Sequence, residues 1–229
     1  MTRDVDIRKA LLANLEVKYS DSSHDLIVEE FGCKTARADV AVINGFLHAY
    51  EIKSDSDSLD RLPSQIDAYQ GVFEYVTLIC GRRLLERART AIPKWWGLQR
   101  AEFRDGGVLI HELRTAKPNP NQNPFAVARM LWKTEALAVL RRFGHRGLTS
   151  RCTAEEVWNA VAAHVPINRI RIAMRIHPLA VTRPAAVRAG CDARRAKAGL
   201  ASSSHRILTR QIMQKYIYRR HSLWQSRRF

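Results

Sequence analysis

The chain has 229 residues, of which 46% are apolar and 8% aromatic, and it carries a formal net charge of +16. This length allows one substantial domain with an appendage, and no run approaches the roughly 20 apolar residues that a membrane-spanning helix needs. The N-terminus mixes acids into its short apolar stretch, which argues against a signal peptide and favours a cytoplasmic location with no membrane partner.

The first elements are predicted to be a helix and three strands. Apolar residues at helical spacing indicate an amphipathic helix over residues 6–19. Three short β-like runs follow, at residues 26–31, 38–43 and 46–53. Asn44 and Gly45 join the last two runs and are a strong hairpin signal, because both residues tolerate positive φ. The pattern therefore predicts a meander of three antiparallel strands.

The next elements complete an α/β core. Pro63 stands where a first helical position is expected. The sequence then predicts, in order, a helix that continues to residue 75, a buried strand at 76–80, a helix at 84–92 and a strand at 108–113. Helix, three-stranded antiparallel meander, helix and strand form the expected core of residues 1–116.

The remainder of the chain divides into three segments. Residues 117–124, with three prolines and three asparagines, are predicted to be a linker. Residues 125–177 are predicted to form a small helical module, with one helix over 126–143 and a second that starts at the capping box Thr153-x-x-Glu156. Residues 178–229 form a basic tail, rich in Ala, Arg and Ser, which we expect to be disordered or partly helical.

The positive charge is concentrated in this C-terminal region. Residues 1–165 contain 23 Lys and Arg against 21 Asp and Glu, whereas residues 166–229 contain 15 against 1. The tail could bind phosphates in a salt-sensitive, sequence-independent way. It could equally reflect a shifted reading frame in a GC-rich gene, with no selected role.

Asp39, Glu51 and Lys53 are the candidate catalytic residues. Hydrolysis of a phosphodiester requires that charge on the phosphoryl oxygens be neutralised and that a hydroxide-like nucleophile be supplied, and a hard dication held by carboxylates can do both. Magnesium prefers one or two carboxylates together with water. Glu51 and Lys53 are two apart on a predicted strand and therefore project from the same face. A lysine beside the water can stabilise or orient it.

The register of the predicted hairpin decides whether the two carboxylates meet. With a two-residue loop, Asp39 would oppose Tyr50, and the carboxylates of Asp39 and Glu51 would point to opposite faces. A three-residue loop with Gly45 in the left-handed conformation, or one bulge, brings Asp39, Glu51 and Lys53 to one face. The functional hypothesis therefore predicts an irregular hairpin.

Gln65 and Tyr69 are four apart on the next predicted helix and share one face of it. They could flank the site and hold a carboxylate, a water or a substrate phosphate. Alternatively, they cap and pack the helix.

The string RADVAVINGFLHAYEIKSDSDSLDRLPSQIDAY resembles the core of the PD-(D/E)XK nuclease superfamily. The resemblance rests on an acidic residue on the second strand, Glu-x-Lys on the third, and the Gln-x-x-x-Tyr motif of the RecB-like branch on the next helix. It covers residues 5–115, and the stretch through IPKWWGL is similar to an uncharacterised bacterial family that carries this core. It implies a restriction-endonuclease-like fold, which is also the fold of Holliday-resolvase-like nucleases.

The resemblance also implies a role for each motif residue. Asp39 and Glu51 would bind Mg (or Mn), Lys53 would act on the attacking water, and Gln65 and Tyr69 would be accessory.

Two further positions bear on the resemblance. Such nucleases commonly have an acidic residue before the second strand, and Glu30 is favoured for this role over Glu16 and Glu29. Ala38 stands where the family has a nominal proline, which is often absent in relatives.

Three functions follow from these features. The leading one is a metal-dependent nuclease that acts on DNA. The second is a non-catalytic module that keeps the fold and holds nucleic acid or a partner protein. In the third, the chain is a nuclease subunit that works only inside a larger protein complex; a homodimer is also compatible with a nuclease that cuts both strands. The helical module could contact DNA or could simply be a small core.

Overall fold

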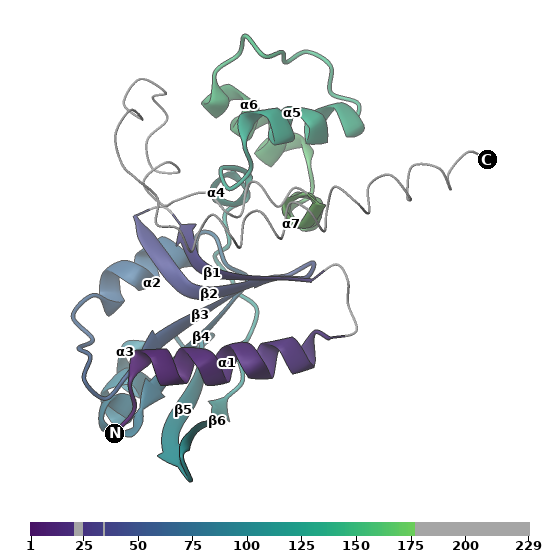
Figure 1. Cartoon of the computed structure of the whole chain (residues 1–229). Helices are drawn as coiled ribbons and strands as arrows, with labels where there is room; N and C mark the ends of the chain where they lie inside the picture. The colour runs from purple at the N-terminus through teal and green to yellow at the C-terminus, as the bar shows by residue number, and fades with distance from the viewer. Residues whose placement is uncertain (21–24, 34, 177–229) are drawn as a thin grey trace, which may run out of the picture. The chain divides into compact units, whose positions relative to one another are not determined.

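The computed structural model describes residues 1–20, 25–33 and 35–176, so the predicted basic tail lies outside the described residues. Within them, a mixed α/β fold contains one six-stranded sheet and seven α-helices (Figure 1). The first elements are α1 (Asp4–Lys18), β1 (Leu26–Cys33), β2 (Ala36–Ile43), β3 (Leu47–Lys53) and α2 (Leu62–Gln70). The next are β4 (Tyr75–Gly81), η1 (Arg82–Leu84), α3 (Leu85–Ala91), β5 (Gly97–Arg104) and β6 (Gly107–Arg114). The last are α4 (Pro124–Ala128), α5 (Lys133–Arg142), α6 (Ala154–His164) and α7 (Ile167–Ile176).

The strands follow one another across the sheet in sequence order, from β1 to β6. The first three strands form the predicted antiparallel meander. Strand β4 lies parallel to both β3 and β5, and β6 lies antiparallel to β5. Parallel neighbours require a crossover connection, and α2 forms the one between β3 and β4. Lys53 is the last residue of β3 and thus lies at the start of the connection that leads into α2.

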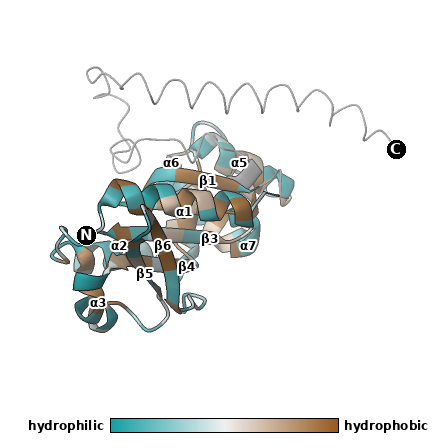
Figure 2. Ribbon diagram, turned by 60° about the horizontal axis from the view of Figure 1, so that its bottom comes forward, coloured by the Kyte–Doolittle hydropathy of each residue, from teal (hydrophilic) through white to brown (hydrophobic). Residues whose placement is uncertain are grey.

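Helices cover both faces of the sheet. On one face, the apolar stripe of α1 (Ile7, Leu11 and Leu15) packs against residues such as Val40, Val42 and Ile52. On the other face, a larger cluster joins the strands to α2 and to helices α4 to α7. Because the central strands are covered on both sides, apolar residues occupy successive positions at 40–43 in β2 and at 78–80 in β4. Figure 2 shows apolar (brown) stretches along these strands.

The β2–β3 hairpin has the predicted irregular loop. Ile43 pairs with Leu47, which leaves three residues, Asn44, Gly45 and Phe46, in the loop. Gly45 has a φ of 99°, in the region that favours glycine. The two-residue alternative is excluded, and the ladder extends to the pair formed by Val40 and Tyr50. Continuation of this register would set Asp39 opposite Glu51.

Several element boundaries differ from the sequence prediction. Strand β5 was not predicted, because Leu98 and Ala101 are its only buried apolar side chains and a bulge between Leu98 and Gln99 interrupts its alternation. Helix α2 ends at Gln70 rather than at residue 75. The helix predicted over 126–143 is two helices, because the Glu135 side chain accepts a hydrogen bond from Trp132 N (2.8 Å) and starts α5 anew.

Other features of the helical module agree with the prediction. Thr153 is the N-cap of α6, and its side chain accepts a hydrogen bond from Glu156 N (3.2 Å). The Glu156 carboxylate accepts in return from Thr153 N (2.6 Å), so that the predicted capping box is present. Every helix in the described part of the chain is too short or too polar to cross a membrane.

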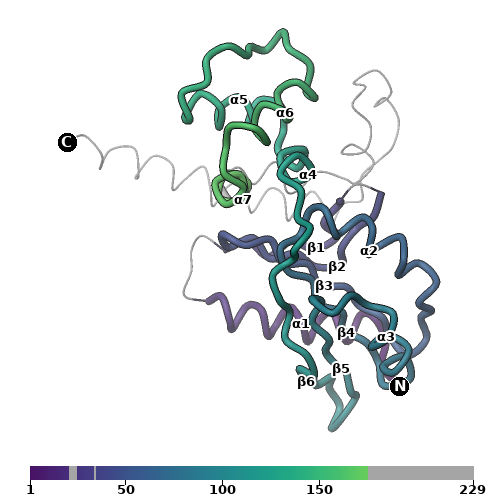
Figure 3. Tube along the Cα trace, turned by 180° about the vertical axis from the view of Figure 1, so that it is seen from behind, coloured from purple at the N-terminus to yellow at the C-terminus, as the bar shows by residue number. Residues whose placement is uncertain are grey.

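The segment after β6 attaches the helical module to the sheet. Its extended chain runs past the strands to α4 (Figure 3). Asn119 Nδ2 donates to the carbonyl oxygens of Gln70 (2.6 Å) and Phe73 (2.8 Å), and Gln122 Nε2 donates to that of Val72 (2.7 Å). The described helices belong to the same compact unit as the sheet. The predicted linker at 117–124 is therefore bonded to the core, and its role as a domain boundary stays a prediction.

Gly45→Ala should lower the free energy of unfolding by about 1 to 2 kcal/mol, because an L side chain is strained at positive φ. No heavy atom lies within 4 Å of the added Cβ, so the effect would report backbone strain rather than a clash. Chemical denaturation measures it. Gly107→Ala is the matched control, since its Cβ also meets nothing within 4 Å and no positive φ is present there. An equal change at both positions would contradict the strained loop.

Candidate functional site

Three side chains converge on the carboxylate of Glu51. Lys53 Nζ and Gln65 Nε2 each lie 2.6 Å from Glu51 Oε1. The Tyr69 hydroxyl lies 2.7 Å from Glu51 Oε2 and 2.9 Å from the carbonyl oxygen of Arg37, with a single proton to share between them. Glu51 is only 2% exposed and Lys53 4%. A buried carboxylate is thus surrounded by donors from its own strand and from α2.

The local sequence explains this arrangement. Glu51 and Lys53 alternate on β3 and therefore reach the same face, where α2 packs. Gln65 and Tyr69 are one helical turn apart on α2, so that both can face the strand. The Tyr69 ring is fully buried and stacks on Trp96, with ring centroids 6.0 Å apart. The apolar core thereby fixes the position of the tyrosine hydroxyl.

Burial and a neighbouring charge change the ionisation of the site. Desolvation, followed by the negative charge of Asp39, raises the pKa of Glu51, and Lys53 and the Tyr69 hydroxyl partly oppose this shift. Burial and the Glu51 charge also raise the pKa of Tyr69, which keeps its hydroxyl protonated. The two carboxylates are therefore close enough to repel each other through the protein.

Asp39 lies where β2 and β3 separate. Its Oδ2 accepts a hydrogen bond from Ile52 N (2.8 Å), and its Oδ1 lies 2.7 Å from a guanidinium nitrogen of Arg8. Arg8 also donates to the backbone oxygen of Asp39 (3.0 Å) and contacts Glu30 Oε1 at 3.1 Å. The side chain of Asp39 is 20% exposed, so that the site reaches solvent on this side.

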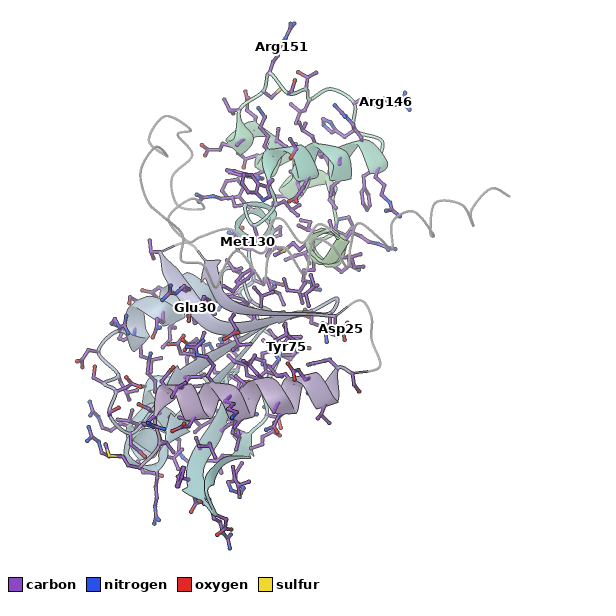
Figure 4. The ribbon with its side chains drawn as sticks, in the orientation of Figure 1. Asp25, Glu30, Tyr75, Met130, Arg146 and Arg151 are labelled. Carbon is purple, nitrogen blue, oxygen red and sulfur yellow. The ribbon has the colours of Figure 1, made fainter. Side chains whose placement is uncertain are left out.

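The strands β1 and β2 are irregular at Glu30 and Asp39. Residues three apart face the same apolar cluster, namely Val28 and Phe31 on β1 and Ala38 and Ala41 on β2. Regular alternation would send them to opposite faces. Glu30 has a φ of 55°, which is uncommon for a residue other than glycine, and its carboxylate forms ion pairs with Arg8 and Arg37. Figure 4 shows the position of Glu30 on the sheet.

The oxygen atoms of the site suit a hard dication. A carboxylate offers about four lone-pair sites; within the described residues Glu51 uses three of them and Asp39 two. Gln65 Oε1 is buried and meets no hydrogen-bond partner in the described part of the chain. No group of three or more His, Cys, Asp or Glu side chains that could hold a metal occurs there either. A cation would therefore rely on the two carboxylates and water, as magnesium commonly does.

The structure brings the sequence-predicted residues together to different degrees. Lys53, Gln65 and Tyr69 contact Glu51 directly, whereas Asp39 interacts with Glu51 through its charge. Glu30 lies one step further away, joined to Asp39 through Arg8.

Arg8, which forms ion pairs with Glu30 and Asp39, was not predicted from the sequence. Its position directly after the buried Ile7, at the margin of the apolar stripe of α1, is a weak signal for a side chain that reaches over the sheet.

Comparison with known proteins relates the chain to a phage protein family. The family described as Bacteriophage P4 protein cII matches residues 1–177, a range that covers both the sheet and the helical module. Protein cII of Enterobacteria phage P4 is 27% identical over 176 residues, which are 75% of this chain and 64% of that protein. The chain thus spans slightly less than two thirds of the length of this relative. No solved structure matches the chain.

Lys53→Met should destabilise the protein in a pH-dependent way. Because Lys53 lowers the pKa of Glu51, its loss raises that pKa further above the ordinary value of 4.5. Below that ordinary value Glu51 is neutral in both the folded and unfolded states, so that the loss of the lysine charge costs little. As the pH rises, the folded state must bury an unpaired carboxylate or keep it protonated. We expect a loss of about 3 kcal/mol at pH 8 and a smaller one at pH 5.

Denaturant unfolding of the variant and the wild type at both pH values measures this difference. The exposed Lys94 gives the control, because Lys94→Met should change stability by less than about 0.5 kcal/mol at either pH. A loss for Lys53→Met that is equal at pH 5 and pH 8 would show that the two charges are not coupled.

Proposed function

The chain belongs to the bacteriophage P4 protein cII family, and we propose that it is a metal-dependent nuclease of the PD-(D/E)XK type that hydrolyses phosphodiester bonds of DNA. The observation that carries this proposal is the convergence of Lys53, Gln65 and Tyr69 on Glu51, with the charge of Asp39 close enough to raise the pKa of Glu51. These five residues are those of the motifs that suggest this superfamily.

The order of the elements supports the proposal. The segment from α1 to β4 contains a helix, three antiparallel strands, a crossover helix and a strand parallel to the third. This is the order expected for a restriction-endonuclease-like core. The acidic residue lies on the second strand, the Glu-x-Lys pair on the third, and the Gln-x-x-x-Tyr pair on the crossover helix. Each motif therefore stands on the element where the resemblance expects it.

The proposed roles follow from the surroundings of each residue. Asp39 and Glu51 would hold Mg (or Mn), which when bound neutralises charge on the phosphoryl oxygens and lowers the pKa of water. Gln65 and Tyr69 fix the orientation of the Glu51 carboxylate through hydrogen bonds. Lys53 places an ammonium group beside the same carboxylate, where it can donate a hydrogen bond to a water. Arg8 holds Asp39 from the side of α1 and balances its charge.

A binding role without catalysis is the second candidate. It is favoured by the burial of the Glu51–Lys53 ion pair and by the engagement of Asp39 with Arg8, because a substrate phosphate must displace or approach these groups before hydrolysis. In that case the fold would hold nucleic acid or a partner protein, and the three charges would serve stability.

The test is cleavage of double-stranded and single-stranded DNA by the full chain, with Mg or Mn and with EDTA. We expect cleavage by the wild type that depends on the metal. Asp39→Asn and Lys53→Met should each reduce the rate at least about 100-fold, because each removes charge stabilisation at the reacting phosphate. Circular dichroism at the assay temperature confirms that each variant is folded.

Asp60→Asn is the matched control, since Asp60 is an exposed acid outside the site and its change alters the net charge by the same amount. It should cleave at the wild-type rate. Equal cleavage by the wild type and Asp39→Asn, or cleavage in EDTA, would rule out the proposed mechanism. DNA binding without cleavage by the wild type would favour the binding module.

A further inference from the structure

The loop between α5 and α6 concentrates arginines on an exposed surface. Arg141 and Arg142 end α5, and Arg146 and Arg151 lie in the loop that follows; all four are exposed. Phe143, between them, is 42% exposed. Figure 4 shows Arg146 and Arg151 extending outward from the module. We call these four arginines together with Phe143 the arginine surface.

The acids of the module do not neutralise this surface. Residues 136–154 contain no Asp or Glu. Glu135 accepts from Trp132 N and Glu156 from Thr153, and Glu155 lies beside Glu156 in the first turn of α6, so that all three acids lie at helix N-termini. Within the described residues, no ion pair involves any of the four arginines. Exposed positive charges that no nearby acid compensates favour an anionic partner.

Hydrogen bonds and apolar contacts hold the loop between α5 and α6 in place. Lys133 Nζ donates to the carbonyl oxygen of Ser150 (2.8 Å), and His145 N donates to that of Leu140 (3.0 Å). Gly144 has a φ of 82°, which allows the chain to turn away from the end of α5. Leu148 and Cys152 pack against the hydrophobic cluster. Arg146 and Arg151 therefore extend from a loop that is anchored on both sides.

The charge of the module also differs from that of the sheet region. Residues 125–176 contain 9 Lys and Arg against 3 Asp and Glu, whereas residues 1–124 contain 17 against 18. The region with the candidate catalytic site thus has almost no net attraction for a polyanion. A guanidinium can donate two parallel hydrogen bonds to a phosphate, and an exposed aromatic ring can stack on a base or pack on a sugar.

We propose that the arginine surface binds the phosphate backbone of double-stranded DNA. The choice of ligand rests on the proposed function, because DNA is the substrate of the proposed nuclease. The module then supplies affinity that the nearly neutral sheet region lacks, without reading the base sequence. Binding of this kind weakens steeply with salt, because each neutralised phosphate releases condensed counterions.

The experiment measures binding of a fluorescent 30-base-pair DNA duplex to the full chain by anisotropy, in EDTA and over a range of salt concentrations. The double variant Arg146→Gln/Arg151→Gln should bind roughly tenfold more weakly at low salt. Its slope of log affinity against log salt should be smaller by about 2, because two phosphates are no longer neutralised by arginines. Because EDTA prevents metal-dependent cleavage, binding is measured independently of catalysis.

Arg87→Gln/Arg89→Gln is the matched control, because both arginines are exposed on α3 and the variant loses the same charge. It should keep the wild-type affinity and salt slope. An equal loss in the two double variants would overturn the proposal in favour of a net-charge effect. Displacement of the duplex by poly-glutamate as readily as by unlabelled duplex would overturn it in favour of an acidic protein partner.

The outcome also separates this proposal from the proposed function. Loss of duplex binding in Arg146→Gln/Arg151→Gln, together with no cleavage by the wild type, would support the arginine surface and reject the nuclease. Unchanged binding in this variant, together with metal-dependent cleavage, would reject the arginine surface and support the nuclease.

Discussion

The carboxylate of Glu51 is the group on which the arrangement of β3 and α2 depends. A buried carboxylate is costly unless it is paired and hydrogen-bonded, and here the required partners come from two elements: Lys53 from the same strand, Gln65 and Tyr69 from the helix. Tyr69 is in turn placed by apolar packing, because its ring stacks on that of Trp96. The polar centre and the hydrophobic core therefore specify the same position of α2 against the sheet.

The position of the Asp39 side chain depends on a different feature: both β1 and β2 are irregular at this point. Regular strands would continue the β2–β3 ladder past Val40, and the backbone of β2 would then pair with β3 next to Glu51. Instead the strands separate, and the side chain of Asp39 accepts the hydrogen bond from Ile52 N. Glu30, in a backbone conformation that costs about 1 to 3 kcal/mol for a residue other than glycine, is held there by Arg8 and Arg37. As a result, the side chain of Asp39 is partly exposed to solvent, whereas that of Glu51 is buried.

The sequence predicted what depends on local rules. The capping box at Thr153 followed from its spacing, whereas the three-residue hairpin loop followed from the functional hypothesis that Asp39 and Glu51 share one face. Contacts between segments that are far apart in the sequence could not be predicted from such rules. The end of α2 is fixed partly by Asn119, some fifty positions later, and the N-cap of α5 is Trp132, which is not a typical N-cap residue. Arg8 was missed for the same reason, since Glu30 and Asp39, two of its three acidic partners, lie on other elements.

Under the proposed function, the charges around the buried site indicate which groups would meet the substrate. Of the two carboxylates, Glu51 pairs with Lys53, whereas Asp39 pairs with Arg8, which also contacts Asp4 and Glu30. The carboxylates are held by strands, whereas the cations stand at the ends of long side chains with several rotatable bonds. Under the proposed function, a dication held by Asp39 and Glu51 would carry the balancing charge, and Arg8 and Lys53 would be the side chains that turn toward a phosphate. Under the proposed function, the cations that stabilise the centre in the absence of metal are then the groups best placed to meet the substrate.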